Sequence, residues 1–313
     1  MKKRKARAPR RRRAPSRPKR PAVAGLIRST ALRLKRAKLV FAHGTSDPVA
    51  EAAFLVGETL GIHPDHIDAR AGMTVTAAQQ KRISALADRR IRTRKPAAYL
   101  LNRIYIRGVP FYIDERAIVP RSYLGEILDS ETFAGESFSL VRDPGAIESI
   151  LDLCTGSGCL AILAALRFPE AKVDAVELSK DAIEVARKNV ADHHLKKRVR
   201  LLRGDLFAPL KAARYDLIIS NPPYVDDEGM AALPPECRHE PALAFDGGSD
   251  GLSVIRRILD EAGRHLKPGG GLLCEVGRCR PAIERAYPDL RFLWLDTEAS
   301  SGEVFWLDAA ELL

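Results

Sequence analysis

The feature that most constrains this chain is the regular alternation of short apolar runs with helical stretches from residue 150 onward. Strands separated by helices in this way form a mostly parallel sheet whose two faces are both covered. We therefore predict an α/β domain with a doubly wound sheet over residues 126–313. The expected strands are 150–154, 173–178, 199–202, 215–220, 271–276, 290–295 and 303–307, and the expected helices include 160–166, 181–191 and 251–266.

A glycine turn, Cys154-Thr155-Gly156-Ser157-Gly158, follows the first expected strand. In a doubly wound sheet, ligands bind beyond the carboxyl ends of the strands, where this turn lies. Its glycines let the backbone approach a ligand closely, and the N-terminus of the next helix favours a carboxylate. The turn lacks the full Gly-x-Gly-x-x-Gly spacing, and no Gly-Lys-Ser/Thr follows it. A nucleotide site is therefore indicated, and both NAD and a P-loop ATP are disfavoured.

Acidic residues follow the second and third expected strands. Glu177 lies about twenty residues after the glycines, where a carboxylate can accept hydrogen bonds from a ribose diol. Asp205 and Leu206 follow the third strand and are placed to meet an adenine base. Each acid alone could be a surface residue at a strand end, but Glu177 and Asp205 together with the glycine turn favour one ligand site.

The fourth expected strand runs directly into Asn221-Pro222-Pro223-Tyr224. The Asn221 carbonyl oxygen and a backbone carbonyl of the proline pair can accept both protons of a planar NH2 group, and neither proline carries a competing N–H. Tyr224 is placed to cover one face of that group and exclude water. These four residues are the predicted catalytic set. The alternative is an ordinary strand-to-loop turn, because Asn-Pro and Pro-Pro are common turn signals.

The ordered series of glycine turn, acid, second acid and Asn-Pro-Pro-Tyr resembles the class I S-adenosylmethionine-dependent methyltransferases that modify planar NH2 groups. The resemblance implies a seven-stranded sheet in the order 3-2-1-4-5-7-6 with the seventh strand antiparallel. It also implies S-adenosyl-L-methionine as the cofactor. The residues expected to bind this cofactor are Cys154, Thr155, Gly156, Ser157, Gly158, Glu177, Asp205, Leu206 and Asn221.

The segment 111–122, ending in Pro120-Arg121-Ser122, looks like the connector of protein-glutamine N5-methyltransferases, in the branch that modifies large-subunit ribosomal protein number three. The segments 238–241 and 248–252 are also similar to that branch. The resemblance implies methyl transfer to the side-chain amide nitrogen of a glutamine in that ribosomal protein. The alternatives are glutamine methylation of peptide chain release factors, or methylation of an adenine N6 or another RNA amino group. The predicted substrate-binding residues are Phe111, Arg121, Asn221, Tyr224 and Glu240.

Two of the residues near the predicted site have open roles. Arg121 either binds the substrate main chain or orders the connector, and an exposed arginine is the ordinary alternative. We expect His239 to orient or support the site rather than act as a general base, because the proton can leave after methyl transfer.

Upstream of the α/β domain, the apolar spacing predicts a helical domain at 39–96. The resemblance implies that this domain recognises the substrate. The alternating segment 104–113 predicts a β-hairpin with Gly108 near its turn, within a connector at 97–125.

The first 20 residues contain twelve Lys or Arg and no acid, and the remaining 39 basic residues balance 40 acidic ones. Dense like charge with few apolar side chains predicts a disordered basic arm, which we extend over residues 1–38. The arm either attracts ribosomal RNA or is a solvated extension. A non-catalytic assembly factor that holds RNA is a further interpretation of the whole chain.

Five cysteines, an odd number, suggest free thiols in a cytoplasmic protein. No pair has Cys-x-x-Cys spacing, so no metal site is predicted. No apolar run approaches the ~20 residues needed to span a bilayer.

Overall fold

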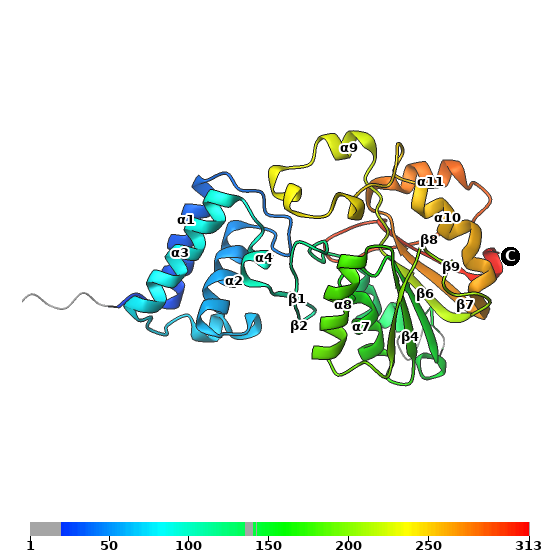
Figure 1. The fold of residues 1–313 in the computed structure, drawn as a ribbon, viewed down its shortest axis with the longest axis horizontal. Helices are drawn as coiled ribbons and strands as arrows, with labels where there is room; N and C mark the ends of the chain where they lie inside the picture. Colours follow the sequence, from blue (N-terminus) through cyan, green and yellow to red (C-terminus); the bar gives the residue numbers. More distant parts are fainter. Residues whose placement is uncertain (1–19, 135–139, 142, 313) are drawn as a thin grey trace, which may run out of the picture.

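The computed structural model describes residues 20–134, 140–141 and 143–312. A helical domain lies at one end of the molecule, an α/β domain lies at the other, and a short β-hairpin lies between them (Figure 1). The first nineteen residues of the predicted arm lie outside the described part.

The helical domain begins earlier than the sequence analysis placed it. Residues 23–36 form a helix, so the prediction of a disordered arm reaching residue 38 is wrong. Val23, Leu26 and Leu34 are spaced to face one side of this helix, and they are buried against the next two helices. The helices of this domain are α1 (Val23–Arg36), α2 (Pro48–Leu60), α3 (Ala77–Thr93) and α4 (Ala97–Leu101).

Local signals fix the ends of these helices. The Asp47 carboxylate caps α2 by accepting from the Val49 and Ala50 N–H groups, and Gly61 ends it with a left-handed backbone. Thr76 and Gln79 form a reciprocal capping box at the start of α3. Inside the domain, the fully buried Arg90 guanidinium donates to the Glu51 carboxylate at 2.8 Å.

The predicted hairpin is confirmed as β1 (Ile104–Ile106) paired antiparallel with β2 (Val109–Phe111). Arg107 and Gly108 both have positive φ at its turn, as a tight two-residue hairpin requires. After the hairpin, the chain passes through α5 (Leu124–Asp129) and α6 (Glu131–Ala134) into the sheet.

The α/β domain has a seven-stranded sheet in the order β5-β4-β3-β6-β7-β9-β8. In chain order this is 3-2-1-4-5-7-6, and β9 pairs antiparallel with both of its neighbours, so the expected topology is confirmed. The strands are β3 (Ser149–Leu153), β4 (Lys172–Glu177), β5 (Val199–Arg203), β6 (Tyr215–Ser220), β7 (Leu266–Glu275), β8 (Leu293–Leu295) and β9 (Val304–Asp308).

Helices cover both faces of this sheet (Figure 1). One apolar core joins the sheet to α5, α7 and α8, and a second joins the opposite face to α10 and α11. No described helix is both long and apolar enough to cross a membrane. The remaining helices are α7 (Cys159–Arg167), α8 (Lys180–Asp192), α9 (Asp227–Ala231), α10 (Ser253–Ala262) and α11 (Arg280–Ala286).

Candidate active site

The glycine turn joins β3 to α7 at the carboxyl edge of the sheet. Gly156 and Gly158 both have positive φ, and Cys154 at the start of the turn does too. A Cβ at Gly156 would meet nothing within 4 Å, whereas one at Gly158 would lie 3.2 Å from the Ala186 Cβ. Gly156 therefore keeps backbone open toward a ligand, and Gly158 lets α7 pack closely on α8.

A buried carboxylate lies beneath this turn. Asp152 on β3 is fully buried, and burial raises its pKa to about 7. Its Oδ2 accepts from the Thr155 hydroxyl and from the Ala161 N–H at 3.0 Å. The Ser157 hydroxyl is buried as well, 3.1 Å from the Cys159 sulfur. Thr155 and Ser157 are predicted cofactor residues, and their hydroxyls are engaged by Asp152 and Cys159.

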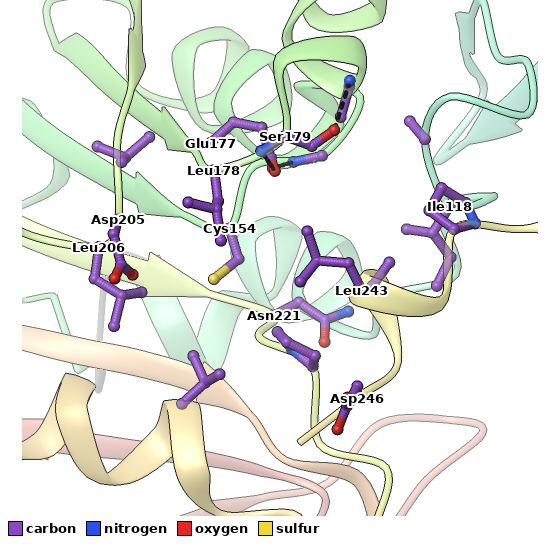
Figure 2. Close-up of a pocket in the computed structure, with 18 of the residues that line it drawn as sticks. Ile118, Cys154, Glu177, Leu178, Ser179, Asp205, Leu206, Asn221, Leu243 and Asp246 are labelled. Carbon is purple, nitrogen blue, oxygen red and sulfur yellow. Dashed lines mark hydrogen bonds between the residues drawn. The ribbon is translucent and has the colours of Figure 1, made fainter. Parts of the chain in front are cut away.

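A cavity opens between the ends of β3, β4, β5 and β6, and we call it the first cavity (Figure 2). Glu177 at the end of β4 lies on its wall and accepts from the Gly156 N–H at 2.8 Å and the Ser179 N–H at 2.7 Å. Burial raises the pKa of this carboxyl. The predicted cofactor residues that line the cavity are Cys154, Gly156, Glu177, Asp205, Leu206 and Asn221. Val176, Leu178 and Leu243 line it as well.

The residues that line the first cavity fit S-adenosylmethionine. The carboxylate of Glu177 has remaining acceptor capacity for a ribose diol, and Asp205 at the cavity rim is half exposed and paired with Arg257 at 2.9 Å. Apolar side chains from Val176, Leu206 and the loop at Leu243 supply a surface for a flat base. The open space in front of Gly156 leaves room for the ligand where a side chain would stand.

A second cavity adjoins the first. Its walls come from the connector, from the glycine turn, and from Pro222 and Tyr224. Ile118, Cys154, Gly156, Asn221 and Ala244 line both cavities. Asn221 and Cys154 therefore both lie where the two cavities meet, and Figure 2 shows them on the wall of the first cavity. Burial raises the pKa of the Cys154 thiol, so this junction carries a neutral sulfur.

Tyr224 is held by a buried carboxylate that the sequence analysis did not identify. Its hydroxyl donates to Glu275 Oε1 at 3.2 Å. Glu275 Oε2 accepts from the Ser122 hydroxyl at 2.6 Å and from the Tyr123 N–H at 2.8 Å. Burial raises the pKa of Glu275 to about 7 and holds that of the Tyr224 phenol well above its usual range. Glu275 thereby connects the connector to the loop 221–224, which is predicted to be catalytic and is called the catalytic loop below.

Three glycines surround Tyr224. A Cβ at Gly247 would lie 2.8 Å from the Tyr224 Cα, and one at Gly251 would lie 2.6 Å from its carbonyl oxygen. A Cβ at Gly277 would lie 2.6 Å from the ring itself. Val225, the next residue, hydrogen-bonds to the segment at 245–247 through its N–H and its carbonyl. The 247–251 glycines therefore support the backbone of the catalytic loop.

Three predicted substrate residues have internal roles. The side chain of Glu240 is buried and accepts from the Val119 N–H at 2.9 Å and from both terminal nitrogens of Arg121. Arg121 also donates to the Ala42 carbonyl at 3.1 Å, so it orders the connector while its exposed part lines the second cavity. Contrary to the prediction, Glu240 lies beneath the site and Phe111 is in the core, 2% exposed.

The segment at 235–240 also docks on the helical domain. Glu236 accepts from the Val40 N–H at 3.0 Å and pairs with Arg94 at 2.6 Å. The His239 ring nitrogen lies 3.0 Å from the Thr93 carbonyl, which agrees with its expected supporting role. The two domains are therefore joined next to the second cavity.

One buried cluster offers metal-ligand atoms. His43, Cys237 and Glu240 each place one such atom within 4.8 Å of the others. His43 Nε2 lies 3.0 Å from Glu240 Oε2, and the Arg121 guanidinium lies beside the same carboxylate. The positive charge of Arg121 opposes a second cation there, so the cluster is a hydrogen-bonded network.

Asn189 is a further residue that sequence reasoning missed. It is buried on α8, where its amide donates to the Ser157 carbonyl at 2.9 Å and to the Tyr112 carbonyl at 3.0 Å, while its oxygen accepts from the Tyr112 N–H. It thus joins the glycine turn to the connector. A polar residue on the apolar side of a predicted helix is the signal that could have found it.

Comparisons with known proteins agree with this geometry. Residues 139–233 match the methyltransferase small domain, and residues 26–101 match the PrmC N-terminal domain. Three curated relatives are named ribosomal protein uL3 glutamine methyltransferase. The protein of Bradyrhizobium diazoefficiens is 64% identical, over 91% of this chain and 90% of its own length. That of Bordetella pertussis is 47% identical over 92% and 95%, and that of Burkholderia pseudomallei is 45% identical over 93% and 95%.

The sheet topology and the cavity at its carboxyl edge define a class I S-adenosylmethionine-dependent methyltransferase. The identity to these relatives extends through both domains and the connector. The chain belongs to the ribosomal protein uL3 glutamine methyltransferase family.

Proposed function

We propose that this chain transfers a methyl group from S-adenosyl-L-methionine to the side-chain amide nitrogen of a glutamine in ribosomal protein uL3. The observation that carries the proposal is the position of Asn221, which lines both the first and the second cavity. A planar amide entering through the second cavity reaches the junction where the first cavity begins. The relatives' shared name supplies the identity of the substrate.

The cofactor, when bound, supplies an electrophilic methyl group on a positively charged sulfur. An amide nitrogen is a poor nucleophile because its lone pair is delocalised into the carbonyl, so the protein's main task is orientation. The side-chain oxygen of Asn221 and the backbone carbonyl of Pro222 are proposed to accept hydrogen bonds from the two N–H groups of the glutamine amide. Tyr224, fixed by Glu275 and the surrounding glycines, covers the amide and excludes water.

Proton removal needs no base before transfer, since the methylated nitrogen is cationic and acidic. Tyr224 is a neutral phenol that already donates to Glu275, and Cys154 is a neutral thiol. Neither is suited to take a proton. Release of the proton to water after transfer fits these surroundings.

The part of the helical domain beside the second cavity and the connector are proposed to recognise the folded substrate. Both border the second cavity, the helical domain through Ala42 and the connector through residues 118–122. We propose that the enzyme works in the cytoplasm, because its proposed substrate is a ribosomal protein.

The test is methyl transfer from labelled cofactor to uL3 purified from cells lacking the enzyme, with the modified fragment identified by mass spectrometry. Asn221→Ala is expected to lower kcat on the order of 100-fold or more while cofactor binding is retained. Asp227→Ala, at an exposed position at the start of α9, is the matched control. Unchanged turnover in the Asn221 variant would refute the orientation role, and label in a release factor or in RNA would replace the proposed substrate.

A further inference from the structure

The helical domain carries a positively charged surface that the proposed chemistry does not use. Helices α1 and α3 run side by side in the same direction. The Val23 N–H donates to the Met73 carbonyl at 3.0 Å near their starts, and the Arg94 guanidinium donates to the Lys38 carbonyl at 3.0 Å near their ends. Between these points Arg33 donates to the Ser84 hydroxyl at 3.1 Å. The two outer faces thus form one continuous surface.

Cations dominate this surface. Helix α1 contains no acidic residue, and the acid of α3, Asp88, is already paired with Arg33. The exposed cations, which together we call the α1–α3 basic surface, are Arg28, Lys35, Arg36, Lys38, Lys81, Arg82, Arg89 and Arg92. On α3 they extend from Lys81 to Arg92, roughly 16 Å along the helix.

The sequence adds to this charge. Twelve Lys or Arg fall within residues 1–20, directly before α1 begins at Val23. The rest of the chain is balanced in charge, so the excess is concentrated at this one end of the sequence. Such asymmetry is the electrostatic signature of a surface that binds phosphate backbones.

An anionic membrane is a poorer match than a nucleic acid. Helices that lie on membranes present a broad apolar face beside their cations. On α1 and α3 the one large hydrophobic residue that is strongly exposed is Leu32. Since the proposed substrate is a ribosomal protein, the nucleic acid that accompanies it is RNA.

We infer that the α1–α3 basic surface binds the phosphate backbone of RNA associated with the ribosomal protein substrate, an inference that rests on the proposed function. The surface lies at the end of the molecule farthest from the sheet (Figure 1). RNA bound there leaves the second cavity open to a protein segment. The surface therefore holds the substrate particle, and the catalytic loop acts on the glutamine.

The test measures binding of a labelled ribosomal RNA hairpin to the full-length protein by fluorescence anisotropy over a range of salt concentrations. The variant Lys81→Gln/Arg89→Gln/Arg92→Gln removes three exposed charges while keeping residues that favour helix. If each of these three side chains contacts a phosphate, the slope of the logarithm of the binding constant against the logarithm of salt concentration becomes shallower by about 2 to 3. Affinity for the hairpin at 0.1 M salt then falls roughly 10- to 100-fold. The matched control, Lys172→Gln/Lys196→Gln/Lys197→Gln, removes three exposed charges from the α/β domain and should leave both values nearly unchanged.

A second measurement separates this inference from the proposed function. Methylation of RNA-free uL3 by the α3 variant should match that of the unaltered enzyme, whereas KM for uL3 bound to its RNA fragment should rise. Equal RNA affinity of the two triple variants would overturn the inference, as would tighter binding to anionic vesicles than to RNA. Loss of methylation on RNA-free uL3 would contradict the separation of roles. Failure of unaltered enzyme to methylate uL3 at all would instead refute the proposed function.

Discussion

Replacing Glu240 with alanine tests the network that joins the two domains. The change removes the acceptor of the Val119 N–H at 2.9 Å and the partner of His43 at 3.0 Å, both in buried surroundings. Each group left without a partner costs about 1–3 kcal/mol. Arg121 is partly exposed and can regain water, so its share is small. We expect a loss of about 3–5 kcal/mol in the free energy of unfolding, the range for a broken buried pair.

The pH dependence of this loss follows from the pKa of Glu240. Burial alone would raise that pKa, but the hydrogen bond from His43 and the charge of Arg121 outweigh it, so the folded-state pKa lies below its ordinary value of 4.5. A depressed carboxyl pKa contributes stability above the unfolded-state value, and that stability is lost as the pH falls through the folded-state pKa. The difference between the variant and the unaltered protein should therefore be large at neutral pH and shrink under acid conditions.

The assay is thermal unfolding followed by circular dichroism at neutral and acidic pH. The expected decrease in Tm at neutral pH is about 6–10 °C for a chain of this size. Glu170→Ala, at an exposed position, is the control and should change Tm very little. A decrease equal to that of the control, or one that persists undiminished in acid, would refute the reasoning.

Three further changes test the catalytic loop and the helical domain. Glu275 has a folded-state pKa of about 7 against an ordinary 4.5, so its contribution to stability is lost as the pH rises between these values. In chemical denaturation, Glu275→Gln should therefore remove a change of about 3 kcal/mol in the free energy of unfolding across this pH range. An unchanged pH profile of stability would count against the assignment. Gly277→Ala pushes a Cβ against the Tyr224 ring and should lower kcat on the order of 10- to 100-fold, whereas Gly269→Ala, with a similar positive φ but open space, should not. Arg90→Met leaves the buried Glu51 carboxylate unpaired and should cost about 3–5 kcal/mol in denaturant unfolding, against almost no loss for exposed Arg82→Met.

The strands of the sheet were predictable because they are nearly continuous apolar runs. Leu151, Ile218 and Leu273 are buried within such runs, and the resemblance supplied their order. The position of the catalytic loop followed directly, since Asn221 comes next after β6. Helix α1 was missed because the arm predicted from the dense charge of residues 1–20 was extended to residue 38, although Leu26 and Leu34 fall on one helical face.

Contacts between distant segments explain the remaining errors. Glu240 lies in a polar loop that gives no sign of burial, yet Arg121 and His43 enclose its carboxylate. Phe111 ends a short strand whose buried side is fixed only by packing against the α/β domain. Glu275 ends an apolar strand, and its partners Ser122 and Tyr224 are far from it in sequence. Such roles depend on tertiary structure, which a local pattern does not encode.

The docking of segment 235–240 on the helical domain has a consequence for substrate choice. Glu236 and His239 hold this segment to residues 40 and 93–94, close to the second cavity. The distance between the helical domain and Asn221 is therefore fixed by these contacts. A target protein must therefore carry its glutamine at a fixed distance from the surface that binds the helical domain. We expect selection to depend on the shape of the folded target, so that a short peptide with the same local sequence is a much poorer substrate.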